Sequence, residues 1–163
     1  PRRISALQAL LVEDNALNAE IAQILLTDEG ATVTVVTDGK QAVEIVQNNP
    51  PDTFDAVLMD VMMPVMNGID AAKTIRSLNR PDAKTLPIIA MTANAFEDAQ
   101  KCLAAGMNAH LAKPLQIKEV KQTIAEWVKN TELQKGRVKR PFFILRITHP
   151  ADYRPNPHDG TLS

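Results

Sequence analysis

The sequence predicts an α/β fold in which a five-stranded parallel sheet carries helices on both of its faces. Short apolar runs, of the length that a buried strand needs, alternate with longer segments in which apolar residues recur at helical spacing. This alternation continues through about the first 130 of the 163 residues. Strands that alternate with helices favour parallel pairing, and the right-handed crossover rule leaves few arrangements of such a sheet.

Turn and capping residues divide the chain into these elements. Asn15 is suited to cap the first helix and Gly30 to end it. The pair Asp38-Gly39 marks a turn after the second strand, and Gly106 ends the fourth helix. The five predicted strands are residues 7–12, 33–36, 54–59, 86–91 and 109–112.

Apolar residues at helical spacing predict five helices and the face that each turns toward the sheet. The five stripes are Leu17, Ile21, Ile24 and Leu25; Ala42, Ile45 and Val46; Ala72, Ile75 and Leu78; Phe96, Ala99 and Leu103; and Ile117, Val120, Ile124, Trp127 and Val128.

The composition excludes several classes of protein. There are 18 lysines and arginines against 19 acidic residues, so the net charge of −1 gives no support to nucleic-acid binding. The single cysteine, Cys102, cannot form an internal disulfide. No apolar run approaches the ~20 residues that cross a bilayer. The chain begins with Pro1, without a secretory signal or an initiator methionine, so we expect a processed chain or a piece of a larger protein.

The last 28 residues, 136–163, do not continue the pattern. They hold four of the 11 prolines and three of the six aromatic residues, and their charge is +3, whereas residues 1–135 carry −4. Residues 142–147 are apolar enough to pair as a strand. We therefore divide the chain into a domain over residues 1–130 and a tail over residues 131–163. The tail is interpreted as a linker or disordered extension, an arm exchanged within a homodimer, or a segment added by cloning.

Polar residues stand where four of the predicted strands end. Glu13 and Asp14 follow the first strand, Asp60 the third, Thr92 the fourth and Lys113 the fifth. Ligands of parallel α/β sheets bind at the carboxyl ends of the strands. A parallel sheet would therefore bring these five residues to one edge, although they are far apart in the sequence.

Such an edge has a defined chemistry. Three carboxylates that lie together raise each other's pKa and cost stability unless a cation neutralises them. Carboxylate oxygens are ligands that Mg²⁺ prefers, and one lysine is too little charge to replace the metal. A metal and an ammonium together can hold a phosphoryl group, and Asp60 could attack its phosphorus as a nucleophile.

Other interpretations of these residues are structural. Acidic residues favour helix N-termini, so Glu13, Asp14 or Asp60 could each serve as a cap or turn residue. Residues 13–18 contain no glycine, which excludes the glycine-rich phosphate loops of dinucleotide and P-loop proteins. His110 is more often a partly buried structural residue than a sensor, and Cys102 is expected to be inert.

Four short motifs at these strand ends resemble those of the receiver domain of two-component response regulators. The resemblance covers about residues 5 to 130. It implies a flavodoxin-like fold with strand order 2-1-3-4-5. The motifs are Leu-Val-Glu-Asp-Asn (11–15), Leu-Met-Asp-Val-Met-Met-Pro (58–64) with Met-Asn-Gly (66–68), Met-Thr-Ala-Asn (91–94) and Ala-Lys-Pro (112–114). Residues 13–18 and 106–114 are particularly similar to receivers fused to hybrid sensor histidine kinases.

The resemblance implies a phosphoacceptor and a magnesium site. Asp60 would accept the phosphoryl group. Asp14 and Asp60 would bind Mg²⁺ directly, and Glu13 directly or through water. Met62, two residues past Asp60, would provide a backbone carbonyl to the metal.

The resemblance also implies the residues that respond to the phosphoryl group. Thr92 would donate a hydrogen bond to it, Lys113 would pair with another of its oxygens, and Pro114 would follow a cis peptide bond. Receivers often carry Tyr or Phe as a rotating switch three residues before the lysine. Here that position is His110, an imidazole that can titrate near neutrality.

The function that this predicts is that of a phosphorelay receiver. It would take a phosphoryl group from phosphohistidine onto Asp60 with Mg²⁺, and lose it by hydrolysis or pass it on. Its partners would be a histidine kinase, a histidine phosphotransfer domain, or both. We expect it in the cytoplasm, as the excised receiver of a hybrid kinase whose kinase core this chain lacks. The alternatives are a receiver-like interaction module that works without phosphorylation, and a hydrolase on the same fold.

Overall fold

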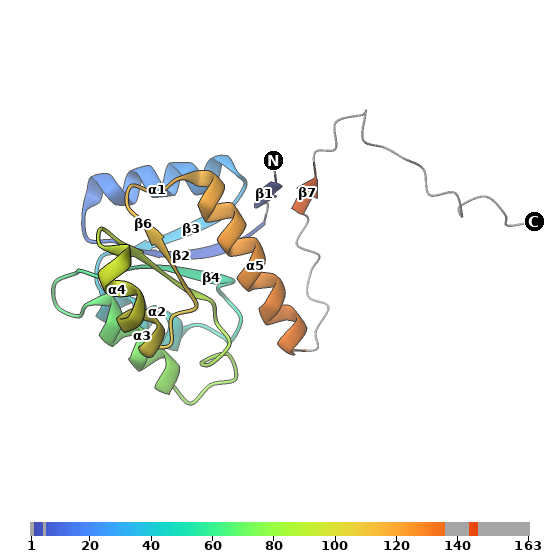
Figure 1. Cartoon of the computed structure of the whole chain (residues 1–163). Coiled ribbons are helices and arrows are strands. Elements are labelled where there is room, and N and C mark those ends of the chain that lie inside the picture. Colours follow the sequence, from blue (N-terminus) through green and yellow to red (C-terminus); the bar gives the residue numbers. More distant parts are fainter. Residues whose placement is uncertain (1, 5, 136–143, 147–163) are drawn as a thin grey trace, which may run out of the picture.

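Five parallel strands form the central sheet, in the spatial order β3-β2-β4-β5-β6 (Figure 1). The computed structural model describes residues 2–4, 6–135 and 144–146. Counted along the chain, the five strands of this sheet lie in the predicted order 2-1-3-4-5, so the predicted fold class is confirmed. The strands are β2 (Gln8–Val12), β3 (Thr32–Val36), β4 (Ala56–Asp60), β5 (Ile88–Thr92) and β6 (Ala109–Ala112).

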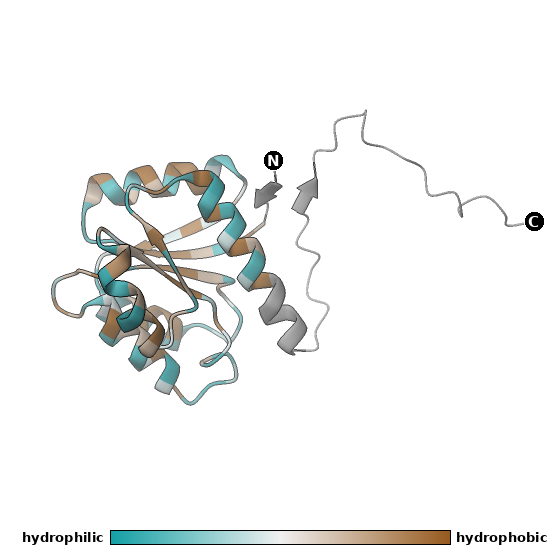
Figure 2. Ribbon diagram, viewed as in Figure 1, coloured by the Kyte–Doolittle hydropathy of each residue, from teal (hydrophilic) through white to brown (hydrophobic). Residues whose placement is uncertain are grey.

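Five helices cover the two faces of this sheet. Helices α1 and α5 pack with one apolar cluster, whereas α2, α3 and α4 pack with the other. Figure 2 shows the hydrophobic residues concentrated along the strands between these layers. The bounds are α1 Ala16–Asp28, α2 Gly39–Asn48, α3 Gly68–Ser77, α4 Ala95–Ala104 and α5 Ile117–Lys135.

The central strands are buried on both faces. Every residue of β4 is buried, and successive side chains join opposite clusters: Val57 and Met59 lie on the α2, α3 and α4 side, and Leu58 on the α1 and α5 side. This alternation follows from the two-residue period of a strand. It explains why these strands read as continuous apolar runs in the sequence.

Side-chain caps fix where the first three helices begin. The Asn15 side chain accepts a hydrogen bond from the Asn18 amide at 3.0 Å, which confirms the predicted cap of α1. Asp38 caps α2 through the Gln41 amide at 2.9 Å, so Gly39 is the first residue of a helix. Asn67 likewise caps α3.

The predicted apolar stripe of α1 faces the wrong way. Leu17, Ile21 and Ile24 are 64%, 49% and 50% exposed, and α1 instead buries Ala19, Ala22 and Leu26. Helix α1 is apolar on both sides, so periodicity alone does not show which side contacts the sheet. Small alanines let the helix backbone lie close to the strands, and that packing decides the orientation.

The stripe predicted for α4 is wrong for the same reason. Phe96 is 97% exposed and Leu103 is also exposed, whereas Cys102 is buried within α4 and Ala105 just after it. The predicted stripe of α5 is correct, because Val120, Ile124 and Val128 are buried against the sheet. Apolar surface is therefore left outside on α1 and on α4.

Part of the predicted tail continues the fold. Helix α5 extends to Lys135, past the expected domain boundary at residue 130. Within the strand predicted over residues 142–147, Ile144–Arg146 forms β7, which pairs antiparallel with β1 (Arg2–Ile4) of the same chain. Residues 142, 143 and 147 lie outside the described residues, and the role of the tail stays a prediction. None of the described helices has the length and apolar character needed to cross a membrane.

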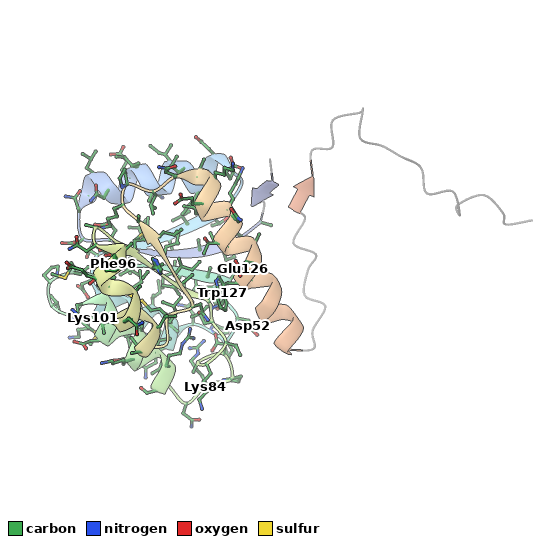
Figure 3. All side chains as sticks on the ribbon, in the orientation of Figure 1. Asp52, Lys84, Phe96, Lys101, Glu126 and Trp127 are labelled. Carbon is green, nitrogen blue, oxygen red and sulfur yellow. The ribbon has the colours of Figure 1, made fainter. Side chains whose placement is uncertain are left out.

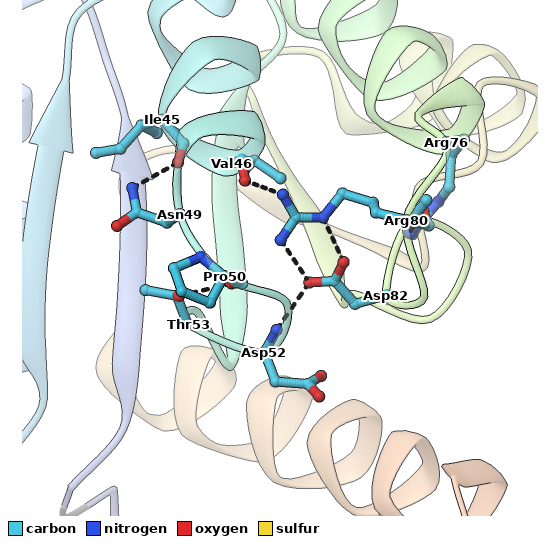
Figure 4. Close-up of polar contacts among 10 residues, drawn as sticks. Ile45, Val46, Asn49, Pro50, Asp52, Thr53, Arg76, Arg80 and Asp82 are labelled. Atoms are coloured by element: carbon cyan, nitrogen blue, oxygen red, sulfur yellow. Dashed lines mark hydrogen bonds and ion pairs between the residues drawn. The ribbon is translucent and has the colours of Figure 1, made fainter.

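A buried ion pair holds the opposite, amino-terminal edge of the sheet. Arg80 Nε lies 2.5 Å from Asp82 Oδ1, and both side chains are largely buried. Asp82 Oδ2 accepts the Asp52 amide at 3.0 Å, and Arg80 Nη1 donates to the Val46 carbonyl at the end of α2 (Figure 4). Burial raises the pKa of Asp82, but the hydrogen bonds from Arg80 and the Asp52 amide lower it by more, so it lies below 3.8.

The substitution Asp82→Ala should destabilise the fold by about 3 kcal/mol, because it leaves the Arg80 guanidinium buried without its counter-ion. The lowered pKa of Asp82 means that its contribution is present above pH 3.8 and is lost as the pH falls through the folded-state pKa. Urea denaturation at pH 7 measures the loss. Asp28→Ala, an exposed acid in α1, is the control. Equal stability of the two variants would contradict the prediction.

Candidate metal and catalytic site

The carboxyl ends of three strands bring together four of the predicted site residues. Glu13 and Asp14 follow β2, Asp60 is the last residue of β4, and Lys113 follows β6. One carboxylate oxygen from each of Glu13, Asp14 and Asp60 lies within 4.8 Å of the others. The prediction that these residues meet at one edge of the sheet therefore holds for this acidic cluster.

Lys113 holds the cluster together electrostatically. Its Nζ lies 2.9 Å from Glu13 Oε2 and 3.0 Å from Asp60 Oδ1. Both carboxylates are buried, whereas Asp14 is exposed at the mouth of the cluster. Backbone amides contribute too, since the Met62 amide donates to Asp60 Oδ1 at 3.3 Å and the Asn15 amide to Glu13 Oε1 at 3.2 Å.

The three carboxylates of the cluster carry more charge than the single ammonium of Lys113 neutralises, and the pKa values of Asp60 and Lys113 are shifted accordingly. Burial raises the pKa of Asp60 from 3.8 to about 6; the hydrogen bond from Lys113 opposes the rise, and the Glu13 charge adds to it. Burial alone would lower the pKa of Lys113, but its two carboxylate partners raise it above 10.5. The lysine therefore stays charged, and the cluster retains excess negative charge.

This donor set suits a hard divalent cation. Three carboxylates from three backbone positions converge, and one ammonium does not neutralise them. Mg²⁺ is bound through a few carboxylate or carbonyl oxygens while it keeps several of its waters, and the exposed Asp14 leaves the cluster open to solvent. Glu13, Asp14 and Asp60 are thus the described residues that could hold such an ion.

A close backbone approach positions the loop after Asp60. The amide of Gly68 donates to the Val61 carbonyl at 3.0 Å. A Cβ at residue 68 would lie 2.1 Å from the Asp60 carbonyl oxygen, so no other residue fits without moving the backbone. The start of α3 is therefore packed directly against the candidate nucleophile. This explains the glycine of the Met-Asn-Gly motif by geometry.

The hydroxyl of Thr92 is engaged away from the acidic cluster. Thr92 is 2% exposed, its Oγ1 donates to Asp98 Oδ2 at 2.5 Å, and it accepts the Asn94 amide at 3.0 Å. Its backbone carbonyl accepts the Lys113 amide at 2.9 Å, which ties it to the lysine. Sequence reasoning missed Asp98. The only available signal was its spacing, six residues past Thr92, and that has meaning only once α4 is known to start at Ala95.

The remaining predicted residues have mixed outcomes. The peptide bond between Lys113 and Pro114 is cis, as expected. His110 on β6 is exposed, so the interpretation as a partly buried residue is wrong. Met62 has an exposed side chain, and the metal-binding role of its carbonyl stays a prediction. Cys102 is buried, and burial raises the pKa of its thiol, in agreement with an unreactive cysteine.

Comparison with known proteins identifies the same pattern across most of the chain. The family model of the response regulator receiver domain matches residues 9–125. The sensor protein GacS of Pseudomonas syringae is 38% identical over 129 residues, covering 78% of this chain but 14% of its own length. Probable histidine kinase 1 of rice is 33% identical over 149 residues, with 73% and 15% covered. The chain thus matches about a seventh of the length of these two relatives.

Solved structures agree with the sequence comparison. The receiver domain of a sensor histidine kinase from Pseudomonas aeruginosa, solved with a magnesium ion in its active-site cleft, superimposes with a TM-score of 0.69 and 39% identity. It covers 77% of this chain and 99% of its own. A receiver of Saccharomyces cerevisiae, solved with a histidine phosphotransfer protein, gives 0.66 and 29% identity, covering 77% and 91%. The chain therefore belongs to the response regulator receiver domain family.

Proposed function

We propose that this chain is a phosphorelay receiver that accepts a phosphoryl group on Asp60 in the presence of Mg²⁺. The observation that carries the proposal is the set of three converging carboxylates around a single, ion-paired lysine. Its partners are a histidine kinase and a histidine phosphotransfer domain. Its membership of the receiver family and the magnesium-bound relative support this assignment.

Asp60 has the properties of a nucleophile for phosphoryl transfer. Its pKa of about 6 leaves it mostly ionised at neutral pH, yet more basic than an ordinary aspartate. One of its oxygens attacks the phosphorus of a phosphohistidine; the phosphorus–nitrogen bond breaks, and its electron pair stays on the imidazole. Lys113 neutralises charge on the phosphoryl oxygens. A cation held by Glu13, Asp14 and Asp60 would supply further charge neutralisation.

The alternative, an interaction module that works without phosphorylation, explains less of the structure. Burying the carboxylates of Glu13 and Asp60 costs stability: burial is the main cause of the raised pKa of Asp60, and the charge of the neighbouring Glu13 adds to it. Glu13 and Asp60 are buried beside Lys113. Such a costly arrangement of charges is expected where the charges bind a ligand. A magnesium titration distinguishes the two functions. The receiver should bind Mg²⁺ at its acidic cluster, whereas an interaction module does not require bound Mg²⁺.

The exposed face of α1 is suited to hold the phosphoryl donor. Leu17, Ile21 and Ile24 recur at helical spacing, so they lie on one side of the helix, and all three are exposed. The helix starts at Ala16, two residues after Asp14 of the acidic cluster and directly after its cap Asn15. A helical histidine domain that packs on this apolar face would therefore lie next to Asp60. Figure 1 shows α1 along an outer edge of the molecule, where a partner has access.

The parent protein is proposed to be a hybrid histidine kinase. The relatives named above are sensor and histidine kinases, of which this chain matches only a small part. The cytoplasmic location that the resemblance implies belongs to the same proposal. Residues 136–163 would then be a segment outside the receiver proper.

Incubation with acetyl phosphate and Mg²⁺ should add one phosphoryl group to the chain, detected by intact-mass spectrometry. The substitution Asp60→Asn should abolish the adduct because it removes the nucleophile, whereas Asp28→Asn, an exposed acid of α1, should leave it unchanged. Chelation of the metal should prevent labelling of the unmodified chain. Labelling that persists in Asp60→Asn would refute the assignment of the acceptor.

Asp60→Asn should also stabilise the metal-free fold by up to about 3 kcal/mol at pH 7.5, the equivalent of a two-unit pKa shift. With its folded pKa at about 6 and its ordinary value at 3.8, Asp60 holds a proton in the folded state that the unfolded chain releases. Stability therefore falls as the pH rises through this window, and the advantage of the variant should grow from pH 4 to pH 7. Urea denaturation with a chelator measures it. A variant that is no more stable than the unmodified chain at pH 7.5 would contradict this prediction.

Ile21→Glu should slow transfer from a phosphorylated histidine phosphotransfer domain by roughly tenfold, as expected for a residue central to an interface. Labelling by acetyl phosphate should stay unchanged, because the small donor needs no docking surface. Leu103→Glu is the matched control, an exposed leucine on α4 across the sheet. The rates are measured by rapid-quench transfer assays. Equal slowing by both variants would exclude α1 as the specific face.

A further inference from the structure

The hydroxyl hydrogen of Thr92 cannot serve two acceptors. A threonine hydroxyl has one hydrogen to donate, and in this structure it is donated to Asp98 Oδ2. The oxygens of a phosphoryl group on Asp60 only accept hydrogen bonds. Thr92 can therefore bond the phosphoryl group only if it gives up its bond to Asp98.

We propose that Asp98 is a positioning residue that holds Thr92 in the resting conformation and competes with the phosphoryl group for its hydroxyl. This inference rests on the proposed function. Phosphorylation of Asp60 would transfer the hydrogen bond of Thr92 from the carboxylate of Asp98 to the phosphoryl oxygen. Asp98 would then be released from the end of β5.

The bond between Thr92 and Asp98 is part of how α4 begins. Asn94 stands at the cap position of α4, but its side chain makes no capping hydrogen bond. Its amide instead donates to Thr92 Oγ1 at 3.0 Å, and its carbonyl accepts the Asp98 amide at 3.0 Å. The Thr92 hydroxyl thus bonds both the amide of the cap residue and the carboxylate of Asp98, and so connects β5 with the first turn of α4.

Movement of Thr92 would therefore alter the start of α4. This helix carries the exposed Phe96 in its first turn and Leu103 further along (Figure 3 labels Phe96 and Lys101 on it). The connection from Asp60 through Thr92 and Asp98 to this apolar surface does not involve residue 110. It thus offers a route for the signal in a chain whose switch position holds an exposed histidine.

Glu97 provides a matched control for Asp98. Both acids lie in the first turn of α4, where either interacts favourably with the helix dipole. Glu97 is exposed, whereas Asp98 is partly buried and bonded to Thr92. Removing either changes the net charge and the helix terminus equally, but only Asp98→Ala releases the hydroxyl. Alanine is also the best helix former, so neither variant threatens α4.

The test measures the affinity of the whole chain for beryllium fluoride, an acyl-phosphate mimic, with saturating Mg²⁺, by calorimetry or fluorine NMR. Asp98→Ala should bind about tenfold more tightly than the unmodified chain, because a charge-assisted hydrogen bond no longer has to be broken. Glu97→Ala should bind as the unmodified chain does. Asp98→Asn, which keeps a weaker acceptor, should lie between them.

Two further measurements separate positioning from a structural effect. In a Thr92→Val background, Asp98→Ala should no longer tighten binding, since no hydroxyl remains to be released. Without ligand, the amide resonances of α4 in Asp98→Ala should shift toward those of the beryllium fluoride complex of the unmodified chain.

Three results would overturn the proposal. Unchanged or weaker binding by Asp98→Ala is the first, and an equal gain from Glu97→Ala is the second. A gain that survives in the Thr92→Val background is the third. If the unmodified chain fails to bind beryllium fluoride at all, the proposed function itself falls and the role of Asp98 with it, so the two failures are distinguishable.

Discussion

The ammonium of Lys113, held between Glu13 and Asp60 at 2.9 and 3.0 Å, is the interaction on which the rest of this site depends. It allows two buried carboxylates to lie next to each other at the end of an apolar sheet, because its opposite charge offsets part of the cost of burying them. It does not neutralise them completely. The remaining negative charge is what suits the cluster to a divalent cation, and the proposed function adds a phosphoryl group held with that cation.

The two edges of the sheet differ in how their buried charges are neutralised. At the amino-terminal edge, Arg80 and Asp82 satisfy each other, and Arg76 donates to the carbonyls of Gly106 and Ala83 at 2.9 and 3.0 Å. Burial lowers the pKa of Arg76 to about 10, yet its donors are used. At the carboxyl-terminal edge the charges are left unbalanced. Paired charges thus lie at one edge of the sheet, and the unbalanced acidic cluster lies at the other.

Two apolar surfaces remain outside this framework, one on each side of the sheet. That on α1 begins next to the acidic cluster, and that on α4 begins next to the bond between Thr92 and Asp98. Under the proposed function, one of these surfaces would meet the phosphoryl donor and the other would change after phosphorylation. Both surfaces begin in the first turn of a helix that follows the carboxyl end of a strand, with Leu17 on α1 and Phe96 on α4.

The sequence by itself determined the five-stranded parallel sheet, the cap at Asn15 and the meeting of Glu13, Asp14, Asp60 and Lys113, because strand period and parallel topology leave little choice. The apolar spacing in the sequence predicted the wrong buried faces for α1 and α4. A helix that is apolar on both sides has no unique inward stripe, and only packing against the sheet selects the side with the small residues. The partner of Thr92 was likewise decided by tertiary structure, because a hydroxyl bonds whichever acceptor the fold places beside it, and only the orientation of α4 places Asp98 there.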